Sequence, residues 1–143
     1  MNLKEFKKVL ASILLDYGFA TKNNISKAET DELIIIISTQ KSNYDNNYYL
    51  NYGFLIKELS PELTTPMDYQ CDIFGRLSLI FEGKILTSIN FENLSSEEFS
   101  YALKISLNER IKPVLEYGLL KYFDLYPTAV STVRMTARKY LGL

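Results

Sequence analysis

The run LIIII at residues 33–37 constrains the fold more than any other part of the chain. Successive side chains of a β-strand point to opposite faces, so both faces here are apolar: Leu33, Ile35 and Ile37 on one, Ile34 and Ile36 on the other. Apolar residues on both faces are typical of a central strand that is buried on both sides. From Ser38 onward the residues are polar, so the strand predicted over residues 31–44 emerges toward solvent at its far end.

A second strand returns beside the first. The residues DNN at 45–47 tolerate turn geometry, and YYLNYGFLIKEL at 48–59 has the alternation of a strand. One face is predicted to cover the core, with Tyr48, Leu50, Tyr52, Phe54 and Ile56. The other face mixes Tyr49, Asn51, Gly53 and Leu55, so it is predicted to be the less buried side of the sheet.

Helix and turn signals complete the expected architecture. An N-terminal helix begins after Asn2 and ends at Gly18, weaker strands are predicted at 25–30 and 69–81, and a tentative fifth strand starts at Lys84. Gly75 is expected to mark a bulge or a close approach.

The last third changes to helical spacing. Ser95 and Glu98 form a capping box that opens a helix, Pro113 must kink or break it, and a final helix is predicted from about Thr128. The prediction is one α+β domain over residues 1–143, with an antiparallel meander of four to five strands. One N-terminal and two C-terminal helices pack on that sheet.

Composition excludes several kinds of chemistry. The 143 residues contain no histidine and one cysteine, which removes Ser-His-Asp and Cys-His catalysis, the usual zinc sites and an internal disulfide. The net charge of −1 disfavours a dedicated nucleic-acid-binding protein. No apolar stretch is long enough to span a membrane, so we expect a cytoplasmic protein that has no membrane partner. We also expect that it needs neither a metal nor a cofactor.

Four short motifs carry a resemblance to a known family. They are DYGF at 16–19, TQKS at 39–42, YLNYGF at 49–54 and CDIFGRL at 71–77. In order and spacing over roughly residues 3–80, the chain resembles the bacterial family known as domain of unknown function 4304. The resemblance implies a small α+β bacterial protein and brings no established activity with it. By analogy with other small bacterial domains, it suggests an immunity or partner-binding role.

Polar residues within these motifs are the first candidates for a binding site. Gln40, Lys41 and Arg76 lie near the ends of two predicted strands, where Arg76 could hold a carboxylate or phosphate in a bidentate fork and Gln40 could orient it. The alternative is an internal salt bridge from Arg76 to Asp72 or Glu58.

Two further arginines, Arg134 and Arg138, are four residues apart and share one face of the predicted final helix. They either complement the dipole of that helix or form a composite anion pocket with Arg76.

Other reactive residue types give no comparable pattern. Stacking of nucleic-acid bases on Tyr44, Tyr48 and Tyr49 would need interleaved basic residues, and residues 42–54 contain none. The carboxylates show no spacing that indicates a magnesium site or a glycosidase pair, and Cys71 is expected to be an inert buried thiol.

These observations favour a non-catalytic domain that binds a protein partner, as an immunity or antitoxin-like factor does. The expected surface is formed by Gln40, Lys41, Tyr49, Asn51 and Arg76. The first alternative is a small-ligand module in which Arg76, Arg134 and Arg138 hold an anion, and the second is a histidine-free enzyme. A homodimer through the sheet is a further alternative for the partner.

Overall fold

The computed structural model describes residues 1–143 and is built around one antiparallel sheet. Its five strands are hydrogen-bonded in sequence order, which makes it a meander: β1 (Ala20–Lys22), β2 (Ile25–Glu29), β3 (Leu33–Lys41), β4 (Tyr48–Ile56) and β5 (Ile73–Arg76). A separate hairpin follows, formed by β6 (Leu79–Phe81) and β7 (Lys84–Leu86). The strand β3 has two partners along its length and lies in the middle of the sheet, as its apolar faces predict.

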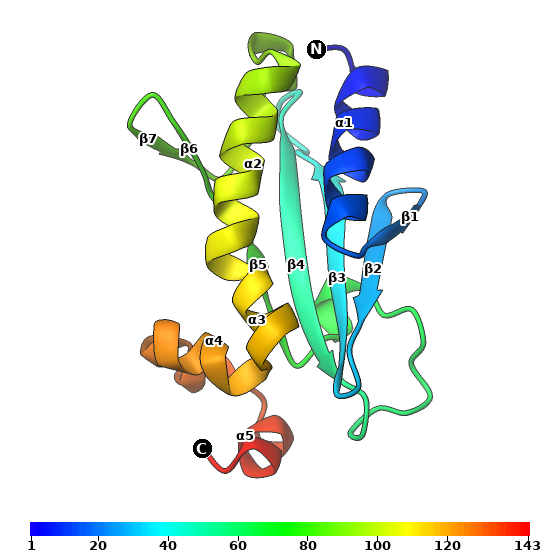
Figure 1. The fold of residues 1–143 in the computed structure, drawn as a ribbon, viewed down its shortest axis with the longest axis vertical. Helices are drawn as coiled ribbons and strands as arrows, with labels where there is room; N and C mark the ends of the chain where they lie inside the picture. Colours follow the sequence, from blue (N-terminus) through cyan, green and yellow to red (C-terminus); the bar gives the residue numbers. More distant parts are fainter.

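Helices cover one face of this sheet. Figure 1 shows α1 (Leu3–Asp16) and α2 (Ser96–Arg110) side by side across it. The chain then continues at one end of the sheet through α3 (Lys112–Tyr117), α4 (Leu119–Leu125) and α5 (Met135–Leu141). Three short 3₁₀ turns complete the chain: η1 (Asp68–Gln70), η2 (Phe91–Asn93) and η3 (Pro127–Thr132). No helix has both the length and the apolar character that a membrane crossing requires.

Local signals account for both ends of α1. The Asn2 side chain accepts a hydrogen bond from the Glu5 amide at 2.8 Å, which satisfies one of the free amides at the helix start. At the other end Gly18 has a φ of +92°, and the amides of Gly18 and Phe19 donate to the carbonyls of Leu15 and Leu14. These two hydrogen bonds form the Schellman motif, which ends the helix and turns the chain toward β1.

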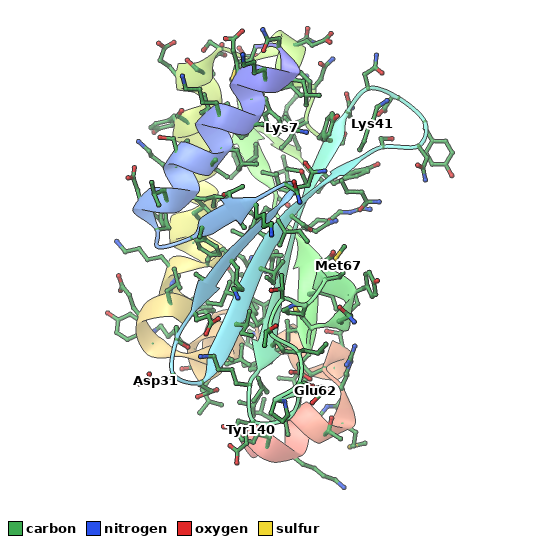
Figure 2. The ribbon with its side chains drawn as sticks, turned by 90° about the vertical axis from the view of Figure 1, so that its right-hand side faces the viewer. Lys7, Asp31, Lys41, Glu62, Met67 and Tyr140 are labelled. Atoms are coloured by element: carbon green, nitrogen blue, oxygen red, sulfur yellow. The ribbon has the colours of Figure 1, made fainter.

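The sheet separates two apolar clusters of very different size. A cluster of 30 buried residues fills the space between the helices and the sheet, and it includes Leu33, Ile35 and Ile37 of β3. On the opposite face a small cluster contains only Ile34, Ile36, Leu55 and Cys71. The segment that follows β4 covers it, with Leu63 packed against it. In Figure 2 this segment, which carries Glu62 and Met67, lies on the side of the sheet away from α1.

The α+β architecture is confirmed, but individual strands differ from the expectation. The fifth strand of the sheet is β1, a three-residue strand that has no clear sequence pattern. The segment predicted as a fifth strand pairs instead with β6 in the separate hairpin. The strand predicted over 69–81 is divided into η1, β5 and β6.

The last third contains more helices than predicted, because the chain is interrupted three times. Pro113 lies in the first turn of α3, where its missing amide breaks no hydrogen bond, so α2 stops at Arg110. Gly118 has a φ of +84° and separates α3 from α4. Pro127 begins η3, so the final helix starts at Met135 and not near Thr128.

Candidate functional site

The sheet face opposite α1 and α2 is the candidate site, and we call it the open face. Directly paired residues of neighbouring strands share a face, so the register assigns the residues of the open face. Ser38 is paired with Ile25 of β2 and with Asn51 of β4. Gln40 is paired with Tyr49, and Asn51 with Arg76. The residues of the open face that concern the site are Lys22, Ile25, Lys27, Ser38, Gln40, Tyr49, Asn51, Phe74 and Arg76.

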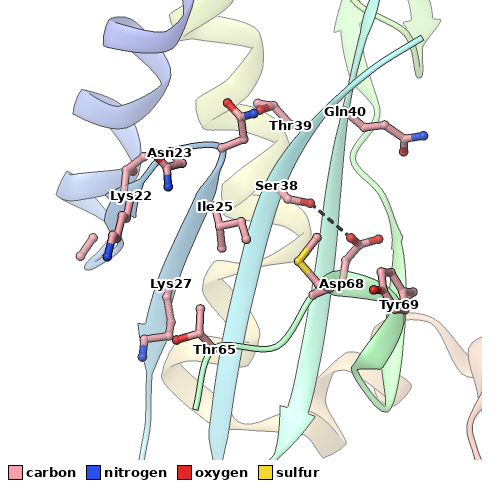
Figure 3. A pocket seen from close by; sticks show the side chains of 14 residues that line it. Lys22, Asn23, Ile25, Lys27, Ser38, Thr39, Gln40, Thr65, Asp68 and Tyr69 are labelled. Atoms are coloured by element: carbon pink, nitrogen blue, oxygen red, sulfur yellow. Dashed lines mark hydrogen bonds between the residues drawn. The ribbon is translucent and has the colours of Figure 1, made fainter. Parts of the chain in front are cut away.

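A cleft of about 850 Å³ occupies part of this face. Its floor is formed by β2 and β3, one wall by the turn between β1 and β2, and the other wall by η1. Figure 3 shows Lys22 and Asn23 on one side, Asp68 and Tyr69 on the other, and Ile25 and Ser38 between them. The cleft therefore joins a partly apolar floor to polar walls.

Hydrogen bonds and ion pairs hold one end of the cleft. The Lys27 ammonium donates to the Thr64 carbonyl at 2.9 Å and lies 3.3 Å from a carboxylate oxygen of Glu29. The other oxygen of Glu29 lies 3.0 Å from the Lys57 ammonium. The two ammonium groups lower the pKa of Glu29, mainly through their hydrogen bonds to it. The Lys27 ammonium therefore already has a hydrogen bond and an ion pair, whereas the exposed Lys22 forms no ion pair.

Asp68 is the acidic residue among those that line the cleft. Its carboxylate accepts a long hydrogen bond of 3.4 Å from the hydroxyl of the buried Ser38, drawn as a dashed line in Figure 3. This contact joins η1 to the central strand. It therefore fixes the wall of the cleft against its floor.

Two side-chain contacts order the open face from Gln40, at the edge of the cleft, outward. The buried Asn51 donates from its amide nitrogen to the Gln40 side-chain oxygen at 2.8 Å, across β3 and β4. The Arg76 guanidinium carbon lies 3.8 Å from the centre of the Tyr49 ring. Stacking uses the flat face of the guanidinium, so its N–H groups along the edge remain available to an acceptor.

Four of the sequence-predicted site residues are therefore neighbours, namely Gln40, Tyr49, Asn51 and Arg76. Lys41 is not one of them. It is paired with Tyr48, and alternation places it on the side of the sheet that carries the helices, although it is exposed at the end of β3. The suggested salt bridge from Arg76 to Asp72 or Glu58 is absent, because Arg76 takes part in no ion pair.

Arg134 and Arg138 are engaged with backbone carbonyl groups. Arg134 donates to the Tyr69 carbonyl at 3.2 Å, which brings it next to η1, whereas Arg138 donates to the Ser131 carbonyl at 3.2 Å within its own segment. Arg134 precedes the first turn of α5, and Arg138 lies in the last turn. Nothing joins the two to Arg76 in one anion pocket.

Of the residues that line the cleft, sequence reasoning named Gln40 and missed the others. Lys22, Ile25 and Lys27 come from two short strands whose pairing depends on the register with β3. Asp68 and Tyr69 come from a turn placed by the fold of the preceding segment. The one usable signal was the alternation of Ile25 and Lys27 with the buried Ser26 and Ala28, which indicates an outward-facing pair.

The groups with the largest pKa shifts lie away from the cleft surface. Burial, reinforced by the charges of Asp72 and Asp68, raises the pKa of the Cys71 thiol to about 12, so it is the inert thiol that the sequence predicts. Burial also raises the pKa of Tyr52, whose hydroxyl lies 3.0 Å from that of Tyr122 in the large core. No group of three Cys, Asp or Glu side chains comes together that could hold a metal ion.

Comparison with known families assigns most of the chain to one family. Residues 10–117 match the family described as Domain of unknown function (DUF4304). The match includes all five strands of the sheet and ends with α3, so the open face lies within it and α4, η3 and α5 lie beyond it. Neither curated proteins nor solved structures provide a match.

Proposed function

The chain belongs to the DUF4304 family, and we propose that it is a non-catalytic domain that binds another protein through its open face. The observation that carries the proposal is the asymmetry of the sheet. Helices pack over the large core on one face, while the other is covered only in part, by the segment after β4, and holds a wide cleft that continues into the surface formed by Gln40, Tyr49 and Arg76. A partner that lies over several strands would cover both parts together.

The geometry favours a protein over a small ligand. A pocket for a small anion needs cations that converge on one point. Here Lys27 is paired with Glu29, and Arg134 is held by the Tyr69 carbonyl. The unpaired cations Lys22 and Arg76 lie on the two edge strands, so they do not converge. An enzyme would need an acid or base whose pKa is tuned for proton transfer inside the cleft, and the shifted thiol of Cys71 is buried beneath the surface.

An immunity or antitoxin-like factor is the particular form that we propose, acting in the cytoplasm. Such a role requires tight binding to one protein, which is favoured when the binding side chains are ordered before the partner arrives. The Asn51–Gln40 hydrogen bond and the Arg76–Tyr49 stack supply that order on the open face.

Site-specific photo-crosslinking in the native host tests the proposal. A benzophenone amino acid replaces Tyr49 on the open face in one variant and Tyr101 in the other, which is 72% exposed on the helix α2. We expect a discrete protein adduct from position 49 and none from position 101, with the partner identified by mass spectrometry. Adducts from both positions, or from neither, would contradict a partner site on the open face.

A homodimer would also yield an adduct at position 49. Light scattering on the purified protein separates the two cases. A monomer in solution supports a different protein as the partner. A dimer together with a self-adduct would show that the partner is a second copy of this chain.

A further inference from the structure

Two opposite charges lie on the two walls of the cleft. Lys22 lies at the wall formed by the turn between β1 and β2, and Asp68 lies at the wall formed by η1 (Figure 3). Lys22 is exposed, Asp68 is half-buried, and neither takes part in an ion pair. The Asp68 carboxylate accepts one long hydrogen bond, of 3.4 Å, from Ser38, so most of its acceptor capacity remains free.

The third charged residue that lines the cleft, Lys27, does not change this polarity. Its ammonium lies 3.3 Å from a carboxylate oxygen of Glu29 and donates to the Thr64 carbonyl, so its charge is already compensated. The cleft therefore has one positive wall, at Lys22, and one negative wall, at Asp68.

The register of the strands gives the separation of the two walls. Lys22 is paired with Ile25, and Ile25 with Ser38, beside which the Asp68 carboxylate lies. Two strand spacings of about 4.8 Å place the two walls roughly 10 Å apart. Between them the half-buried Ile25 forms part of the floor, and Met67 lines the same cleft. The middle of the cleft is therefore suited to an apolar group.

We propose that the cleft receives an apolar side chain of the protein partner, flanked by a carboxylate that reaches Lys22 and by a basic group that reaches Asp68. This inference rests on the proposed function and adds the chemistry of the partner. An extended chain covers 10 Å in about three residues and a helix in about seven, so the acid and the base stand at most about seven positions apart. The segment lies in the cleft above Ile25 and does not cross the buried Ser38 and Asn51.

The polarity of the cleft argues against other classes of ligand. An acidic segment or a nucleic acid would be attracted by Lys22 and repelled by Asp68, and a purely basic segment would meet the reverse. A free amino acid carries both of its charged groups on one carbon atom, so it cannot reach two walls that are roughly 10 Å apart. A protein segment that carries both charges, separated by an apolar group, fits both walls and the floor.

A peptide selection followed by an exchange of charges tests the inference. Random peptides of about twelve residues, long enough to span the cleft as a helix or as an extended chain, are displayed on phage and selected on the immobilised wild-type protein. Binding of the most enriched peptide is then measured by fluorescence anisotropy with the wild type, Lys22→Glu, Asp68→Lys and the double variant. The controls Lys104→Glu and Glu109→Lys make the same changes of charge at exposed positions of α2, on the other side of the sheet.

We expect enriched peptides with an apolar residue between an acid and a base. Each single reversal in the cleft should weaken binding about five- to tenfold, because it replaces attraction by repulsion, and both controls should leave binding unchanged. A peptide with lysine in place of the acid and glutamate in place of the base should bind the double variant Lys22→Glu/Asp68→Lys better than the wild type. If a reversal variant does not fold, as judged by circular dichroism, Lys22→Gln and Asp68→Asn replace it.

Enriched peptides that lack either charge, or binding that responds to only one of Lys22 and Asp68 or to neither, would overturn the inference. So would a selection that enriches no peptide. The proposed function is judged separately by the crosslink at position 49, which does not depend on charge. An adduct at that position together with a peptide indifferent to Lys22 and Asp68 would reject the inferred chemistry of the partner alone.

Discussion

Gly75 and Tyr52 face each other on neighbouring strands, and a Cβ atom on Gly75 would lie 2.8 Å from the Tyr52 hydroxyl oxygen. That is closer than van der Waals contact allows, so Gly75→Ala must displace a ring that is 4% exposed. We expect a loss of about 1–3 kcal/mol in the free energy of unfolding, measured by urea denaturation.

Phe74→Ala serves as its control, since Phe74 is the preceding residue and is 56% exposed on the other face. It should change stability by about 0.5 kcal/mol or less. The double variant Gly75→Ala/Tyr52→Phe should lose less than the sum of its single variants, because the nearest atom has been removed. Full additivity would show that the two residues do not compete for space.

The buried hydroxyl groups of Tyr52 and Tyr122 are predicted to be coupled. They lie 3.0 Å apart, and each residue is 4% exposed, so removing one hydroxyl leaves the other without this partner. We expect Tyr52→Phe and Tyr122→Phe each to cost about 1 kcal/mol, and the double variant clearly less than twice that amount. A double-mutant cycle of unfolding free energies measures the coupling, and a coupling energy of zero would contradict the prediction.

Alkaline pH is predicted to destabilise the protein through Cys71. Its pKa is about 12 in the folded chain against an ordinary value of 9.0, so the thiol is neutral in both states below pH 9. Between those two values the unfolded chain releases the proton and the folded chain keeps it, so the free energy of unfolding falls as the pH rises. Denaturation at pH 8 and pH 10 should show a larger loss for the wild type than for Cys71→Ala. Equal losses would mean that the thiol does not contribute.

Arg76 is predicted to be dispensable for stability. Its guanidinium stacks on Tyr49 and forms no ion pair, so Arg76→Ala removes one contact at the surface. We expect a cost of about 0.5–1 kcal/mol in thermal or urea unfolding. A loss of several kcal/mol would instead assign Arg76 a structural role and disqualify it as a site for probing partner binding.

Pro113 is predicted to tolerate replacement. It lies in the first turn of α3, where an amide would have no partner within the helix. Pro113→Ala should therefore lower stability by about 1 kcal/mol or less, chiefly by adding freedom to the unfolded chain. Leu107→Pro in the buried part of α2 is the contrasting variant and should cost at least about 3 kcal/mol. Comparable losses in both would contradict this account of the break.

Features that depend on neighbouring residues were predictable from the sequence. The alternation over 33–37 and 48–56 assigned β3 and β4 and separated core-facing residues from open-face ones. The capping box at Ser95 and Glu98 located the start of α2, and Gly75 is the predicted close approach. Each of these signals is contained within a few residues, because side-chain periodicity and helix capping act over short distances.

Features that depend on distant pairings were not predictable. The strand β1 has three residues, all exposed, and it exists because its backbone hydrogen bonds to β2. That Lys22 and Arg76 share one row follows from four successive registers, and an error of one residue in any register would move a side chain to the other face. Likewise, the fold of the segment after β4 puts Asp68 over Ser38.

The separation of the large core from the open face has a consequence for evolution and for design. In β3 and β4 the residues that hold the fold together alternate with those that a partner would touch. If the open face binds the proposed partner, a change at Gln40, Tyr49 or Arg76 would alter recognition and leave the packing beneath the helices intact. Under the proposed function, a lineage could exchange one binding specificity for another by substitution at these three positions, because none of them belongs to either buried cluster. A library randomised at those positions would sample the same range of specificities in the laboratory.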